Sequence, residues 1–314
     1  MYANIRNIFG SLWALVILYA WLCGIALLFP IIHQLSNEVL IQTIVGTFVA
    51  AAAGTYGAQV VIEKTKNREM LLEEIRNTNA AIMLAFDTFN ACFSLKKQRA
   101  KPIKEKHDAL QEALDRIPQP PPGQFVLFEY QADYSTLAPI FIVTGPLQKQ
   151  IFEKISAVGR PLALTAALIR AVESLNRSIQ ERNELIEEMR SMPKETAAQK
   201  EAVTFQYFGR TNREGHTDTS FPDFIEAIYR YTDDCIEFSK TLAEDLFAHG
   251  ENLKKKFGKD APKVHKVDFS IAPTELMPNP DDYADWYKAF PKSSEAIAAP
   301  STLPLPKGEN EDTD

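Results

Sequence analysis

Two apolar stretches with almost no charge fill the first 62 residues, and a helical alternation of apolar and polar positions follows. Leu12 to Ile32 is a mainly apolar run of 21 residues. At about 1.5 Å per residue, a helix of that length crosses the hydrocarbon core of a bilayer. Val39 to Ile62 adds 24 residues without a charge. The pattern predicts a transmembrane hairpin over residues 8–62, with spans at about 9–32 and 39–62.

Small residues recur every four positions along the second stretch, at Gly46, Ala50, Gly54 and Ala58. Such a stripe lets another backbone approach closely, as in membrane helix packing. A mildly polar stripe runs beside it and includes Thr43, Thr47, Thr55 and Gln59. Two interpretations stay open. Either the small face packs on the first span and the threonines bond their own backbone, or it joins several copies and the polar stripe lines a pore.

From residue 63 onward, apolar seams with helical spacing predict an all-α domain that extends to residue 290. The second span is expected to continue directly into a stalk, and Pro102 is expected to interrupt that helix. Three long seams are present. They are Leu71, Ile75, Thr78, Ile82, Phe86, Phe89 and Phe93; then Leu164, Leu168, Val172, Leu175, Ile179, Arg182 and Ile186; then Phe224, Ile228, Tyr231, Cys235, Phe238, Leu242 and Leu246.

Other parts of the chain have weaker patterns. Residues 124–145 are rich in aromatic side chains without clear periodicity, so a short strand and a loop packed on the bundle are both open. A third long helix is predicted to begin at Thr219 or Ser220 and to end near Phe257. A short helix is expected around residues 281–290. Residues 291–314 are rich in Pro, Ser, Ala and acidic residues, which predicts a disordered acidic tail.

The charge is divided unevenly along the chain. Of 34 Lys and Arg and 41 Asp and Glu, only Arg6 and Glu38 precede residue 63, so the remaining 33 and 40 account for the net charge of −7. This distribution excludes a purely soluble enzyme, a polytopic transporter and a strongly basic nucleic-acid binder.

Topology follows from the positive charges. The connector between the spans has no Lys or Arg, whereas Lys64, Lys66 and Arg68 follow the second span and Arg6 precedes the first. The positive-inside rule therefore predicts an inner-membrane protein with both termini in the cytoplasm. Three widely spaced cysteines without a CxxC pair fit a reducing compartment.

Signals for catalysis are poor, so we expect no enzyme activity and no cofactor. The chain has no phosphate-binding loop, dinucleotide fingerprint, nucleophile elbow or zinc signature. His216 and Asp218 share a polar loop, but two ligands are too few for a metal site. Asp233, Asp234 and Glu237 either form a carboxylate cluster or belong to a solvated helix face; the second interpretation is favoured.

The densest basic cluster follows the stalk, at Lys96, Lys97, Arg99, Lys101, Lys104 and Lys106. Residue 96 lies about 50 Å along a straight helix from residue 63, beyond the reach of the bilayer's surface potential. If the cluster binds a ligand, a protein or a nucleic acid is favoured over lipid. The alternative is a solvated helix face.

The hairpin, the stalk residues 77–86 (NTNAAIMLAF) and residues 94–98 (SLKKQ) resemble the two-span membrane effectors of bacterial anti-phage systems, of the kind that accompanies some retrons. The resemblance covers roughly residues 1–105. It implies a protein that damages the inner membrane when a cytoplasmic sensor is disturbed. It also implies a partner complex of reverse transcriptase and its nucleic acid.

Three hypotheses follow. The first is a non-enzymatic effector that acts on the lipid bilayer, assembles as a homo-oligomer through the second span and stalk, and receives its signal from a cytoplasmic protein or ribonucleoprotein. The second is a membrane-tethered scaffold or adaptor. The third is an enzyme with an unfamiliar site within residues 124–220.

Overall fold

The computed structural model describes residues 37–118, 128–142, 144–212, 214–290 and 292. Apart from one isolated bridge between Thr211 and Thr217, these residues form helices and extended connections without strands. The prediction of an all-α chain is therefore confirmed. The predicted first span at 9–32 lies outside the described residues, as does the acidic tail of 291–314 apart from Lys292.

The chain divides into two units, Met1–Glu69 and Met70–Asp314. Helix α2 (Asn37–Leu95) belongs to both, because it begins in the first unit and supplies a long helix of the second. The predicted continuity of the second stretch with a stalk is thus confirmed as one helix. In the first unit, every side chain from Thr43 to Glu69 is exposed.

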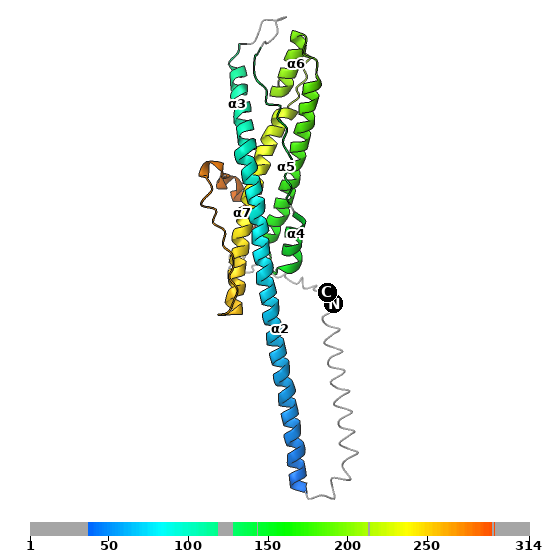
Figure 1. The fold of residues 1–314 in the computed structure, drawn as a ribbon, viewed down its shortest axis with the longest axis vertical. Coiled ribbons are helices and arrows are strands. Elements are labelled where there is room, and N and C mark those ends of the chain that lie inside the picture. The colour runs from blue at the N-terminus through cyan, green and yellow to red at the C-terminus, as the bar shows by residue number, and fades with distance from the viewer. Residues whose placement is uncertain (1–36, 119–127, 143, 213, 291, 293–314) are drawn as a thin grey trace, which may run out of the picture. The chain divides into compact units, whose positions relative to one another are not determined.

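The second unit is a helical bundle in which α5 (Arg160–Ser191) and α7 (Ser220–Phe257) pack along each other (Figure 1). Both helices match the predicted seams, since Leu164, Leu168, Leu242 and Leu246 are fully buried. The remaining elements are π-helix η1 (Lys96–Ala100), α3 (Lys101–Asp115), α4 (Thr144–Lys149), π-helix η2 (Gln150–Lys154), α6 (Ala197–Phe208), the 3₁₀ turns η3 (Thr274–Leu276) and η4 (Pro280–Tyr283), and α8 (Ala284–Ala289).

The phenylalanine seam of α2 is covered by the chain itself. Phe269, in the extended segment after α7, places its ring 6.0 Å from that of Phe86 and 4.8 Å from that of Phe89. Edge-to-face packing of this kind is favourable for aromatic rings. Asn79 holds the same segment, because its amide donates to the Lys263 carbonyl and accepts from the His265 N–H. The phenylalanine seam of α2 is therefore covered by another segment of the second unit.

Pro102 does not interrupt the helix, which corrects the prediction. It occupies the first turn of α3, where a missing N–H is tolerated. The five residues before α3, Lys96–Ala100, form η1, and the Lys101 N–H bonds the Lys96 carbonyl. The wider turn of a π-helix joins α2 to α3 without a break. Single π-turns inside longer helices often mark functional sites.

Residues 128–142 contain no strand. They run extended along the bundle before α4 begins at Thr144, so the loop interpretation of this stretch is confirmed for its described part. At one end of the bundle the segment joins an aromatic cluster in which Tyr130 packs on Tyr207 and Phe208, at ring distances of 5.3 and 5.0 Å.

We predict that Gly250→Ala destabilises the second unit by about 1–3 kcal/mol, the usual cost of overpacking a core. A Cβ at this position would lie 2.7 Å from Cγ1 of Val264 and 3.4 Å from Cγ2 of Thr78. Urea unfolding of the full chain in detergent measures the loss. Gly145→Ala is the matched control, since nothing lies within 4 Å of its added Cβ. Equal stability of the two variants would contradict the packing of residue 264 between α2 and α7.

Candidate functional site

The exposed part of α2 is the most unusual surface of the described residues. Helix α2 and its continuation form the one described helix that is long and apolar enough to cross a membrane. Val49 is 63% exposed and Tyr56 is 74% exposed, and neighbouring valines and isoleucines are exposed to a similar degree. Contiguous apolar surface of this kind marks a membrane or protein contact.

The two predicted stripes both lie on this exposed part. Among the described residues, no atom lies within 4 Å of a Cβ added at Gly46 or Gly54, so nothing described covers the small face that includes Ala50 and Ala58. Within the polar stripe, the Thr47 and Thr55 hydroxyls donate to the carbonyls of Thr43 and Ala51, each at 2.6 Å, and Gln59 is exposed. The threonines therefore satisfy their hydroxyls within the helix, as the simpler interpretation predicts. Helix packing and pore formation stay predictions.

The six basic residues do not form one surface. Lys96 is 1% exposed, pairs with Asp233 of α7 and lies 4.9 Å from the centre of the Tyr229 ring. Lys104 bonds Glu226 at 2.8 Å and Asp108 at 3.0 Å. The Lys101 ammonium reaches the Glu275 carbonyl at 3.4 Å. Half of the predicted cluster is thus engaged within the chain, and the exposed cations are Lys97, Arg99 and Lys106.

The three carboxylates of α7 hold the bundle together and are not a solvated face, contrary to the favoured interpretation. Asp233 pairs with Lys96, Asp234 accepts from the Tyr283 hydroxyl at 2.9 Å, and Glu237 accepts from the Tyr287 hydroxyl at 2.6 Å. Burial raises the pKa of Asp233, and the bond from Lys96 opposes this. Next to them lies an open cavity of about 800 Å³ whose lining includes Glu226, Tyr229, Asp233 and Tyr283.

The polar loop does not gather ligands. The His216 side chain is 82% exposed. The Asp218 carboxylate accepts from the Ser220 N–H at 2.9 Å and so stabilises the turn before α7. In the part of the chain that the structure describes, no group of three His, Cys, Asp or Glu side chains is placed to hold a metal ion.

Glu74 connects α2 to two other parts of the second unit. Its carboxylate accepts from the Ser156 N–H at 2.8 Å and the Ser156 hydroxyl at 2.5 Å, and it lies 3.0 Å from Nε2 of His249. Burial raises the pKa of this carboxyl, but the hydrogen bonds from Ser156 and His249 outweigh burial and leave the pKa below its ordinary value.

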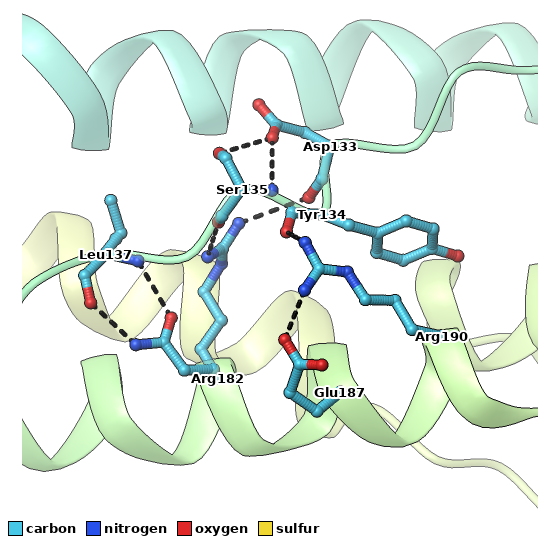
Figure 2. Close-up of polar contacts among 8 residues, drawn as sticks. Asp133, Tyr134, Ser135, Leu137, Arg182, Glu187 and Arg190 are labelled. Atoms are coloured by element: carbon cyan, nitrogen blue, oxygen red, sulfur yellow. Dashed lines mark hydrogen bonds and ion pairs between the residues drawn. The ribbon is translucent and has the colours of Figure 1, made fainter.

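Side chains of α5 hold residues 133–140, named here the strap (Figure 2). Asn183 accepts from the Leu137 N–H at 3.0 Å and donates to its carbonyl at 2.7 Å. Asn176 makes the same pair of bonds to Ile140, at 2.8 and 3.0 Å. Arg182 donates to the Ser135 carbonyl at 2.9 Å, and Arg190 donates to the Tyr134 carbonyl at 2.7 Å.

Sequence reasoning identified Arg182 only as a seam residue and missed the strap contacts. A usable signal was present, because Asn176, Asn183 and Arg190 are spaced by seven and therefore share one helix face. Polar residues with that spacing are equally typical of a helix face that contacts only solvent. The extended segment itself has no periodicity that announces a partner.

Comparisons with known proteins identify no relative. No family model, no curated protein and no solved structure matches the chain. The resemblance to retron-type effectors therefore rests on the hairpin and on residues 77–86 and 94–98 alone.

We predict that Lys96→Met destabilises the chain by up to about 3 kcal/mol, because it leaves the partly buried Asp233 carboxylate without its cation. The double variant Lys96→Met, Asp233→Leu should recover most of that loss. A double-mutant cycle from urea unfolding measures the coupling. Additive losses in the double variant would show that the two groups do not stabilise each other.

We predict that Glu74 stabilises the second unit at neutral pH and stops doing so in acid. Its pKa is lower in the folded chain than its ordinary value of 4.5, so the ionised form favours folding. The contribution is present above that value and is lost as the pH falls through the folded pKa. Urea midpoints of the wild-type chain and Glu74→Gln should differ at pH 7 and converge as the pH falls through the folded pKa of Glu74. A constant difference across this range would assign the effect to packing.

Proposed function

We propose that the chain is a non-enzymatic membrane effector that perturbs the inner membrane when a partner acts on its helical domain. The proposal rests on the two environments of helix α2, which is exposed in its first half and buried in the bundle in its second half. From Thr43 to Glu69 all its side chains are exposed, and from Ile75 onward its seam is buried. A lipid bilayer is the environment in which exposed Val49 and Tyr56 cost least.

The continuity of α2 supplies the link between the bundle and the membrane. A helix is stiff along its axis, and α2 has no proline or unwound turn between Thr43 and Leu95. Under the proposal, a displacement of the α2 seam within the bundle reaches residues 43–62 through this one continuous helix. The Glu74 contacts to Ser156 and His249 restrain that displacement in the resting chain.

The remaining features of the proposal come from the sequence. The cations at residues 64, 66 and 68 favour a cytoplasmic bundle and, with two spans, cytoplasmic termini. The Gly46–Ala58 face favours homo-oligomers within the membrane. The resemblance to retron-type effectors suggests anti-phage defence, with a reverse transcriptase and its nucleic acid as the partner complex.

A membrane-tethered scaffold is the second candidate. It is favoured by the threonine hydroxyls, which are satisfied within α2 and so require no pore, and by the closed seam of the bundle. Under this hypothesis the membrane segment only localises a cytoplasmic partner. An unrelated two-span anchor in place of residues 1–62 should then preserve function, whereas it should abolish the function of an effector.

We predict that induced expression of the full chain depolarises the cell and arrests growth, whereas residues 64–314 alone do neither. Gly54→Leu should abolish depolarisation, because its side chain would block close helix approach on the small face. Ala52→Leu is the matched control, since two residues turn the helix by about 200° and place the leucine on the far face. A potential-sensitive dye measures the effect in each strain.

Equal depolarisation by Gly54→Leu and the wild-type chain would contradict assembly through the small face. Depolarisation by residues 64–314 would contradict the assignment of residues 43–62 as the damaging element. If the full chain alone does not depolarise cells, coexpression with candidate partners tests whether a partner is needed to trigger it.

A further inference from the structure

The strap is held at a regular interval that matches α5. Asn176 bonds Ile140, Asn183 bonds Leu137 and Arg190 bonds Tyr134. Figure 2 shows the last of these contacts. Each step is seven residues on the helix and three on the strap, in opposite directions. Seven helical residues rise about 10.5 Å, and three extended residues rise about 9–10 Å. The helix face therefore presents hydrogen-bonding side chains at the repeat of an extended chain.

These contacts recognise the main chain of the strap rather than its side chains. Both asparagines bond the N–H and the carbonyl of one residue, as a neighbouring strand would. A three-residue repeat is the turn of a polyproline II helix, a form that proline favours and that Pro139 suits. Backbone contacts with few side-chain requirements are how proteins bind extended peptides.

The strap is also exposed in the way that a bound peptide is. Leu137 is its one buried apolar side chain, at 5% exposure. Thr136, Ala138 and Pro139 are exposed, and Phe141, which follows the strap, is 93% exposed. Leu137 is therefore the main apolar anchor of the strap, with partly buried Tyr134 and Ile140 on either side of it.

Arg182 shows that the strap does not satisfy the whole site. Its side chain is fully buried and donates to carbonyls of the strap through both terminal nitrogens, yet its Nε has no partner. Burial lowers the pKa of this guanidinium, and the Asp133 carboxylate opposes this. If the strap left, the Arg182 guanidinium would stay buried without its carbonyl acceptors, which would strongly destabilise the bundle. Another extended chain in place of the strap is therefore favoured over an uncovered α5 face.

We propose that this face of α5 is a binding site for a proline-containing extended peptide of a partner protein, and that the strap is its resident intramolecular ligand. The site requires N–H donors three residues apart, an apolar side chain at the first of them, and carbonyls that reach Arg182. The inference rests on the proposed function for its role, which is to receive the partner's signal. Because the strap competes at high effective concentration, the partner peptide must bind the free groove tightly.

Hydrogen exchange of the unaltered full chain in detergent tests whether the strap opens. The Leu137 and Ile140 amides are both bonded to asparagine, and they should exchange at least about a hundredfold faster than the buried amides of Leu175 and Ile179 in α5. Exchange of all four at the same slow rate would overturn the proposal, since the strap would then open only with the whole bundle.

Peptide binding tests the site itself. The probe is a fluorescent peptide of residues 131–142, and the readout is anisotropy with the full chain in detergent. Leu137→Asp in the chain removes the anchor of the strap and leaves α5 intact, so it should bind the probe at least about tenfold more tightly than the wild-type chain does. Probe methylated at the Leu137 and Ile140 nitrogens should bind at least about tenfold more weakly, because it cannot donate to the asparagines.

Lack of saturable binding to Leu137→Asp, with its helical circular dichroism unchanged, would overturn the proposal, as would equal binding of the methylated probe. If Leu137→Asp does not fold, Ile140→Pro replaces it, because that change removes the N–H that donates to Asn176 and a partly buried side chain, and leaves α5 unchanged. Asn176→Ala with Asn183→Ala in α5 should abolish binding in either background.

These outcomes separate the site from the proposed function. Depolarising activity without probe binding would contradict the peptide-binding site and leave the proposed effector function intact. Probe binding to a chain that never depolarises cells would leave a peptide-binding membrane protein and remove the effector.

Discussion

The second unit depends on how an all-helical bundle satisfies the backbone of its non-helical segments. Helices satisfy their own N–H and carbonyl groups, but the strap and residues 263–269 pack on helices, where no neighbouring strand offers partners. Asparagine side chains supply those partners at Asn79, Asn176 and Asn183. Since Asn79 fixes the segment that carries Phe269 onto the α2 seam, the closure of the core depends on the same device.

Polar pairs have a similar role along α7. The carboxylates of Asp233, Asp234 and Glu237 bond groups from η1 and from the segment after α7. Because these partners come from distant parts of the sequence, α7 holds both η1 and the C-terminal segment by charge and hydroxyl contacts as well as by its apolar seam. The strap, in contrast, is bonded mainly to α5, which leaves it the more independent of the two extended segments.

Sequence periodicity predicted the elements whose position depends only on local apolar spacing or on a capping residue. The seams of α5 and α7, the continuation of α2 and the end of α7 near Gly258 followed from spacing and capping residues. It failed where a local signal competed with tertiary structure. Pro102 reads as a break in sequence, yet the preceding π-turn places it where a helix tolerates proline.

The candidate site was predicted in part for the same reason. The small and polar stripes of residues 43–59 follow from spacing alone. Lys96 is buried because Asp233 lies opposite it, and nothing within residues 96–106 distinguishes it from Lys97. The asparagines of α5 are polar positions on a charged face, and their role depends on a segment about 40 residues away that has no pattern of its own.

The spacing of the bonding side chains along α5 and the spacing of their partners along the strap agree closely but not fully. The number of contacts therefore limits the length of extended chain that α5 can hold. Each further contact adds a mismatch of about 0.5–1.5 Å between seven helical residues and three extended ones. Two short asparagines absorb the first step, and the third contact uses Arg190, whose longer side chain spans a larger offset. This face of α5 therefore fits the seven residues of extended chain from Tyr134 to Ile140, and it selects by contour length as well as by composition.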